Sequence, residues 1–225
     1  MISLRFDGDL AAQVPFLRLG GLLVEGVSGG GATPELNALI EATVAQTAAS
    51  VKLEEISGLP GVAGWRKVMK ALGTDPARYR ISSERLLRRV VKGDGLPQVS
   101  LLVDLVNVWS VVTGLPIGLY DADRLAGSVL TFGAGRSGEA YLTLAGSELE
   151  TAAKPVLRDE AGPCGSPLTD SQRTATHEGT TRCLAVVFGP PLFDDEEFER
   201  HMDLLADWMR HFAGGRVAWR STVNE

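Results

Sequence analysis

Apolar residues recur at helical spacing in five parts of the chain, and residues that often cap helices stand at their ends. The predicted helices cover residues 34–51, 59–73, 84–92, 101–113 and 194–212. Thr33 followed by Pro34 marks the start of the first helix, Ser82 or Ser83 that of the third, and Ser100 that of the fourth. The last helix is amphipathic and is expected to pack against the core.

Shorter apolar runs, separated by glycine-rich turns, predict β-strands. They cover residues 2–6, 16–27, 117–121, 128–132, 139–144, 155–159 and 182–189. The second run contains the pair Gly20 and Gly21, where we expect another backbone to approach. No internal repeat or low-complexity linker divides the chain. The pattern therefore predicts one domain over residues 1–225, with a mixed α/β (α+β) fold in which helices flank a central β-sheet.

Size and composition are those of a soluble globular protein. The chain has 225 residues, of which 44% are hydrophobic and 22% charged, and this is enough to bury a core without crosslinks. Cys164 and Cys183 are too few for a disulfide framework, and neither has a His or Cys neighbour at metal-ligand spacing. We expect no metal and no cofactor, no spanning helix, no secretion signal, and a cytoplasmic location.

Charge is distributed unevenly. The formal net charge is −6, yet residues 66–92 contain nine basic and only two acidic residues. Within the helix at 84–92, four cations fall at i, i+3, i+4 and i+7 and so share one face: Arg85, Arg88, Arg89 and Lys92. A basic face in an acidic chain is typical of a polyanion-binding surface, although a solvated helix face is an equally good interpretation of the sequence alone.

Two polar residues interrupt the apolar helix at 101–113. Asp104 and Asn107 are three residues apart, so they lie on one side of the helix. Buried polar groups need partners, and each costs about 1–3 kcal/mol if left without one. Either the two side chains tie down nearby loops, or they line a pocket.

The sequence lacks the motifs of common hydrolases. There is no G-x-S-x-G elbow, no H-E-x-x-H and no C-x-x-C. Residues 162–181 form a predicted polar loop that carries Arg173 and His177, and His177 is a candidate acid or base. If the protein is an enzyme, its reaction should need little more than positioned water and backbone donors, as hydrolysis of an activated ester does.

The run L-V-D-L-V-N-V-W-S-V-V-T-G-L-P-I-G-L-Y-D at 102–121 resembles the V-D-x-x-N…G-x-P…D segment of the B3/B4 editing domain of bacterial phenylalanyl-tRNA synthetase beta chains. The preceding stretch, YRISSERLLRRVVKGDGLP, resembles more closely the free-standing proteins built from this domain. The resemblance extends over about residues 65–188, with an N-terminal strand and helix extension and a C-terminal helix outside it. It implies a pocket for an amino acid esterified to the 3′ end of tRNA.

The resemblance also assigns roles to particular residues. Asn107 and Asp104 match the motif asparagine and aspartate, and with His177 they are the candidate catalytic residues. Gly118 stands where the synthetase motif has histidine, and Ala185 stands where it has the glutamate that recognises a tyrosine hydroxyl, which argues against tyrosine as the cargo. The candidate tRNA-binding residues are those of the cationic helix face. The candidate substrate-binding residues are Tyr79, Arg80, Gly118, Asp121, Gly165, Thr169, Asp170, Arg173 and Thr174.

The function implied is that of a trans-editing aminoacyl-tRNA deacylase. Its partner would be an aminoacylated tRNA, with a transient synthetase contact, and neither DNA nor a membrane is expected. The cargo implied by the free-standing members is a non-protein amino acid such as canavanine on arginine tRNA, with Asp104, Asp121 or Asp170 facing its guanidine-like head. Two alternatives are a non-catalytic module that binds tRNA or an amino acid, and a hydrolase of free esters that needs no RNA.

Overall fold

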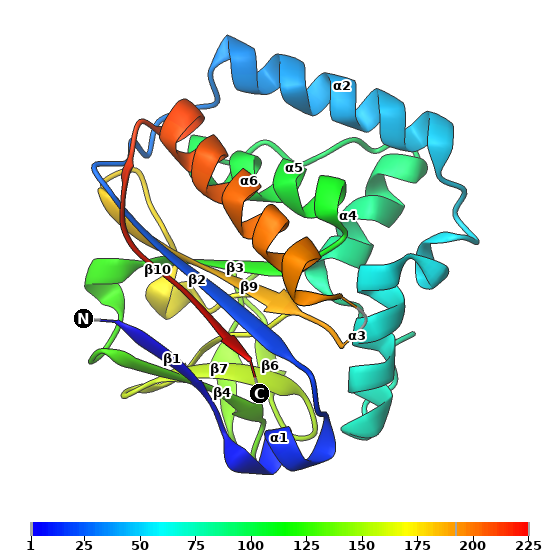
Figure 1. The fold of residues 1–225 in the computed structure, drawn as a ribbon, viewed down its shortest axis with the longest axis vertical. Coiled ribbons are helices and arrows are strands. Elements are labelled where there is room, and N and C mark those ends of the chain that lie inside the picture. The colour runs from blue at the N-terminus through cyan, green and yellow to red at the C-terminus, as the bar shows by residue number, and fades with distance from the viewer. Residues whose placement is uncertain (1, 192, 225) are drawn as a thin grey trace.

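The computed structural model describes residues 2–191 and 193–224 and consists of three layers (Figure 1). Helices cover one face of a four-stranded sheet, and a second four-stranded sheet covers the other face. The helices are α1 (Gly8–Gln13), α2 (Pro34–Ser50), α3 (Pro60–Ala71), α4 (Ser82–Val91), α5 (Leu101–Thr113) and α6 (Asp195–Ala213). The strands are β1 (Ser3–Phe6), β2 (Arg18–Glu25), β3 (Ile117–Asp121), β4 (Val129–Ala134), β5 (Ala140–Leu142), β6 (Glu148–Glu150), β7 (Pro155–Asp159), β8 (Gly162–Gly165), β9 (Arg182–Gly189) and β10 (Arg216–Asn224).

The middle sheet has the strand order β10-β2-β9-β3 and is antiparallel throughout. Strand β9 is buried on both faces, and its side chains alternate between two cores, as the period of two in a strand requires. Cys183, Ala185 and Val187 pack under α5 and α6. Leu184 and Phe188 pack against the second sheet. Both cysteines are free and buried, in agreement with the absence of a disulfide framework.

The mixed α+β class is confirmed, but the expected central sheet is divided into several sheets. The second sheet has the order β1-β4-β7-β8, and β5 and β6 pair as a separate ribbon. Four elements were not predicted: α1, β6, β8 and β10. Strand β8 falls inside the segment 162–181 that we expected to be a loop, because its residues Gly162 and Pro163 read as turn formers and only pairing with β7 makes them a strand.

The predicted caps are correct for two helices and wrong for a third. The hydroxyls of Thr33 and Ser100 accept hydrogen bonds from the backbone of Leu36 and Val103, at the starts of α2 and α5. Helix α4 instead begins at Ser82 after the residue Ile81, which provides no side-chain cap. The hydroxyls of Ser82 and Ser83 lie within its first turn and are buried without a hydrogen-bond partner. Serine before a charged run is therefore an ambiguous cap signal.

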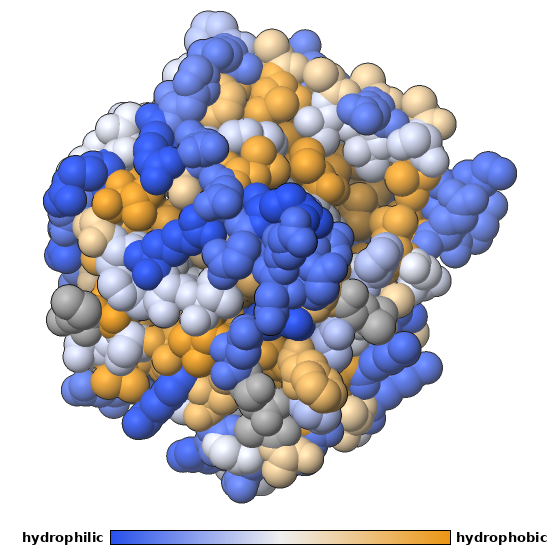
Figure 2. All heavy atoms as spheres, in the orientation of Figure 1, coloured by the Kyte–Doolittle hydropathy of each residue, from blue (hydrophilic) through white to orange (hydrophobic). Residues whose placement is uncertain are grey.

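The glycine pair in β2 admits side chains rather than a backbone. A Cβ added to Gly20 would lie 2.3 Å from the Sδ of Met202, and one added to Gly21 would lie 2.5 Å from the indole of Trp219. Met202 belongs to the apolar stripe of α6, which packs into the core as predicted. The exposed side of α6 forms a band of hydrophilic residues on the face shown in Figure 2. No helix in the described part of the chain is both long and apolar enough to cross a membrane.

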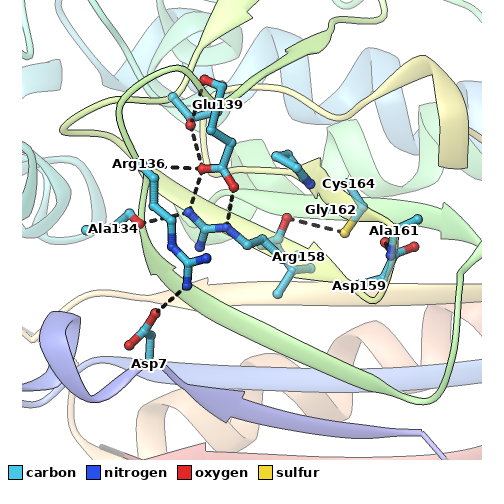
Figure 3. Close-up of polar contacts among 12 residues, drawn as sticks. Asp7, Ala134, Arg136, Glu139, Arg158, Asp159, Ala161, Gly162 and Cys164 are labelled. Atoms are coloured by element: carbon cyan, nitrogen blue, oxygen red, sulfur yellow. Dashed lines mark hydrogen bonds and ion pairs between the residues drawn. The ribbon is translucent and has the colours of Figure 1, made fainter.

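A buried arginine of β7 joins this strand to β4 and to Glu139, the residue before β5. Arg158 forms a bidentate pair with Glu139, with both N–O distances 2.6 Å, and it also donates to the Ala134 carbonyl (Figure 3). Burial raises the pKa of Glu139, but the hydrogen bonds from Arg158 and Thr151 outweigh this effect and lower the pKa to about 2. The pair therefore stabilises the fold only while Glu139 is ionised.

We expect Glu139→Gln to destabilise the protein by about 2 kcal/mol at pH 7, after allowance for solvent screening. The folded-state pKa of Glu139 is depressed, so its contribution is present above its ordinary value of 4.5 and is lost as the pH falls toward 2. Urea unfolding of both proteins at several pH values measures this difference. A gap of the same size at pH 7 and pH 3 would contradict the assignment.

Candidate functional site

A cavity with polar groups from several elements lies where α4, α5 and β3 meet the segment 166–176. Its volume is about 590 Å³, and Leu144 of the β5–β6 turn forms one wall. We call it the main cavity. A second cavity of about 420 Å³ lies between α2, α5 and α6, but none of the predicted site residues lines it. The main cavity is therefore the candidate site.

Helix α5 places only one of its two polar residues in the main cavity. Asn107 lines the cavity, is half-buried, and makes no side-chain hydrogen bond to the described residues. Asp104 does not line it: its Oδ1 accepts a hydrogen bond of 2.8 Å from the Val99 N–H. Burial raises the pKa of Asp104, and the N–H groups of Val99 and Ser100 partly oppose this. Asp104 thus fixes the loop before α5, which was the other interpretation of this pair.

Asp170 provides the one carboxylate among the described residues of the main cavity. Its Oδ2 accepts a hydrogen bond of 3.0 Å from the Leu119 N–H, whereas Oδ1 is buried without a partner. Burial raises the pKa of Asp170 to about 7. The hydrogen bond from Leu119 and the nearby Tyr120 hydroxyl lower it only in part, and the hydroxyl itself lacks a partner of hydrogen-bonding geometry. The floor of the cavity can therefore change charge near neutral pH.

Two glycines make room for this arrangement. A Cβ on Gly118 would lie 2.1 Å from the Tyr120 hydroxyl and 2.9 Å from Asp170 Oδ1. A Cβ on Gly165 would lie 2.4 Å and 2.7 Å from the same two atoms. Both residues were predicted to contact the substrate. In the structure they leave the space that the carboxylate and the phenol occupy.

The segment before Asp170 is held in a tight turn by side chains. Ser166 Oγ accepts hydrogen bonds from the N–H groups of Leu168 and Thr169, at 3.1 and 3.2 Å. The Tyr141 hydroxyl lies 2.8 Å from Ser166 Oγ and donates to the Thr169 carbonyl at 2.7 Å. This turn brings Ser166 and Thr169 to the cavity wall. Of these residues only Thr169 was predicted, because the sequence does not show that Tyr141 meets this segment.

The remaining predicted residues of the polar segment hold it to the sheet and do not line the main cavity. Arg173 pairs with both oxygens of Asp159 at 2.8 Å, and Thr174 donates to the Cys164 carbonyl.

The same is true of His177 and Asp121. His177 Nε2 lies 3.1 Å from Asp121 Oδ2, and its Nδ1 accepts a hydrogen bond from the Gly179 N–H. Asp121 also accepts a hydrogen bond from the Thr180 hydroxyl. Both ring nitrogens of His177 are thus occupied, so the structure offers this histidine no free atom for acid–base work.

The cationic face of α4 borders the main cavity. Arg80, Arg85, Arg88, Arg89 and Lys92 surround a hollow of about 340 Å³ with Asp94, and Arg85 and Arg89 also line the main cavity. Arg85 donates to the Leu168 carbonyl, and desolvation lowers its pKa, although a guanidinium remains charged. Arg89 and Lys92 have no carboxylate partner within residues 2–191 and 193–224. We call the five basic residues around this hollow the basic rim: Arg80, Arg85, Arg88, Arg89 and Lys92.

A buried carboxylate that the sequence did not single out holds part of the basic rim. Glu84 is 1% exposed, and its Oε1 lies 2.8 Å from Arg66, 2.9 Å from Arg88 and 3.7 Å from Arg80. Burial raises the pKa of Glu84, but the hydrogen bonds and charges of Arg66 and Arg88 together keep it below its usual value. The spacing of Arg80, Glu84 and Arg88 at i, i+4 and i+8 is the signal that could have revealed this cluster.

Comparison with known proteins agrees with this architecture. The family model of the B3/4 domain matches residues 64–212, which is more than half of the chain. The chain therefore belongs to the B3/4 domain family. The match begins one residue before the expected region and continues beyond residue 188 into α6.

Among solved structures, the fold is similar to an N-terminal fragment of the phenylalanyl-tRNA synthetase beta-subunit from Pyrococcus horikoshii, with a TM-score of 0.52 and 13% sequence identity. The similarity covers 100% of this chain and 55% of that fragment. At this identity the likeness concerns the fold alone. No curated protein matches the chain.

Proposed function

We propose that the protein is a trans-editing deacylase that hydrolyses the ester bond of mischarged aminoacyl-tRNA. The observation that carries this proposal is the junction of the basic rim with a cavity whose polar groups include one carboxylate, Asp170, and one free amide, Asn107. The arginines and the lysine of the basic rim border the cavity, and the Asp170 carboxylate lies inside it. Such a site is complementary to a molecule with a polyanionic backbone and a cationic end. An aminoacyl-tRNA is such a molecule, because its α-amino group carries a positive charge next to RNA phosphates.

In this proposal the residues of the cavity act by binding and by electrostatics. Ionised Asp170 attracts the α-ammonium group, and this attraction keeps the carboxylate charged in the complex. The Asn107 amide donates to the ester carbonyl oxygen, where negative charge develops as water attacks the carbonyl carbon. The bond from this carbon to the ribose oxygen then breaks, which releases the free amino acid and the ribose hydroxyl. Asp170 is the one titratable anion among the described residues of the cavity, and it already binds the α-ammonium group. The vicinal hydroxyl of the terminal ribose therefore assists the proton transfer.

A panel of mischarged tRNAs, including canavanine on arginine tRNA, tests the proposal. We expect catalytic amounts of the protein to release the amino acid from at least one of them. Asn107→Ala should reduce kcat about 100-fold, as the loss of one oxyanion donor does, while tRNA binding by mobility shift stays within twofold. Stable esters on every tRNA of the panel would refute the deacylase function.

A second candidate function is a non-catalytic module that binds an aminoacyl-tRNA or assists a synthetase. It is favoured by the absence of a nucleophile–base pair among the described residues of the main cavity, and by the engagement of His177 elsewhere. A mobility shift with no loss of ester in the same panel would support this function. Equal cleavage of free aminoacyl esters with and without the tRNA body would instead support a hydrolase that does not need RNA.

A further inference from the structure

A fourth hollow lies beside the main cavity. Its volume is about 240 Å³, and it shares Arg85 and Thr169 with the main cavity. Tyr79 forms one wall, and the β5–β6 turn, with Ala145 and Ser147, forms the other. We call it the Tyr79 hollow. It also shares Arg80 and Arg85 with the hollow at the basic rim, so it borders both the main cavity and the rim.

The ring of Tyr79 is held in place. The Lys154 Nζ lies 4.4 Å from the ring centroid, and because Lys154 is only 7% exposed its position is fixed by packing. The Arg78 guanidinium lies 5.2 Å from the same centroid on a side chain that is exposed. Nucleobases stack on aromatic rings and on guanidinium groups, and here an aromatic ring lies next to an exposed guanidinium.

The surroundings of the hollow are apolar and cationic. Leu149, which is half-buried, and Leu168, which is buried, line the hollow beside Tyr79. Arg78 has no carboxylate partner in the described part of the chain, and Arg80 lies 3.7 Å from the Glu84 carboxylate, which Arg66 and Arg88 hold more closely. Apolar side chains for a base and three arginines for a phosphate thus line one small hollow.

We infer that the Tyr79 hollow is a nucleotide subsite for single-stranded RNA, which takes the nucleotide immediately before the one that enters the main cavity. Its base stacks on Tyr79, and its phosphate pairs with Arg80 and Arg85. This inference rests on the proposed function, because it requires an RNA end in the main cavity. A bare phosphate site without base stacking is the competing use of the same arginines.

Binding of short, unacylated RNAs tests the subsite without requiring any hydrolysis. The dissociation constants of the trinucleotide CCA and of adenosine would be measured by calorimetry for the wild type, Tyr79→Ala and Tyr79→Phe. We expect Tyr79→Ala to weaken CCA binding about 10- to 100-fold more than adenosine binding, since stacking of a base contributes about 1–3 kcal/mol. Tyr79→Phe keeps the ring and should remain close to the wild type. Equal losses for both ligands, or equal losses in the two variants, would overturn the inference.

A second pair of variants tests the subsite in case Tyr79→Ala does not fold. Ala145→Glu places a negative charge in the hollow from an exposed position, and Ala48→Glu on the exposed surface of α2 is its matched control. We expect the first to weaken CCA binding at least tenfold at low salt and the second to leave it unchanged. Equal CCA affinity for both variants would refute the subsite.

Failure of the proposed function would appear differently. It would leave every ester intact while CCA still bound in a Tyr79-dependent way. Loss of the Tyr79 dependence with deacylation retained would refute the subsite alone.

Discussion

Asp170→Asn is expected to make the protein more stable at pH 8 by about 4 kcal/mol, measured relative to the difference at pH 4. The physical reason is the buried carboxylate, whose Oδ1 has no hydrogen-bond partner and whose pKa burial raises to about 7 from an ordinary value of 3.8. Asn keeps an oxygen for the Leu119 N–H, so it retains this hydrogen bond without the charge.

The sign of this effect follows from the raised pKa of Asp170. Below about pH 4 the carboxyl is protonated in both the folded and the unfolded chain, and the two proteins should differ little. Between about pH 4 and pH 7 the unfolded chain loses its proton first, so the wild type becomes less stable by about 1.4 kcal/mol per pH unit. Above pH 7 the difference is constant. Urea unfolding at pH 4, 6 and 8 measures it.

Asp207→Asn is a suitable control, because this exposed carboxylate of α6 makes a surface ion pair with Arg210 that should contribute little to stability.

The Asp170→Asn protein should also lose deacylase activity, since it no longer attracts the α-ammonium group. Gain of stability with loss of activity is typical of a residue kept for binding. A stability difference that does not change with pH would show that Asp170 titrates normally.

Reversal of two charges of the basic rim should weaken tRNA binding strongly. We expect Arg89→Glu combined with Lys92→Glu to lower the affinity for tRNA about a thousandfold at low salt, because two phosphate contacts are lost and two repulsions are added. The slope of log K against log[salt] should also become shallower by about 2. These two cations have no carboxylate partner in the described chain, so their replacement leaves no buried charge behind. Filter binding at several salt concentrations measures both quantities.

Lys67→Glu combined with Lys70→Glu is the matched control. These two lysines are exposed on α3, belong to the same basic stretch of sequence, and line neither the main cavity nor the hollow at the basic rim. The control should change tRNA binding only by the general effect of net charge. If both double variants lose affinity equally, tRNA does not dock on the basic rim.

Much of the fold follows from local patterns in the sequence. The apolar stripe of α6, the Thr33 and Ser100 caps, and the run that becomes β9 each depend on neighbours in sequence, and the structure confirms them. The division of the strands into two four-stranded sheets and a two-stranded ribbon was not predictable in this way. It depends on which strands pair, and β10 carries a mixed pattern because it lies at a sheet edge and is only half-buried.

The candidate site, like the fold, was predictable only where it depends on neighbours in sequence. The cationic face of α4 follows from helical spacing, and Asn107 follows from a polar residue on an apolar helix. The hydrogen bond between the Asp104 side chain and the Val99 N–H could not be predicted from helical spacing, because it depends on the path of the loop before α5. The raised pKa of Asp170 likewise requires β3, β8 and the segment 166–176 to meet, and these are distant in sequence.

The β5–β6 turn has a consequence for how such a protein can diversify. Leu144 faces the main cavity, whereas Ala145, its neighbour in the chain, faces the Tyr79 hollow. If the proposed function holds, a single insertion or deletion in this hairpin would alter the pocket for the amino acid and the contact with the tRNA at the same time.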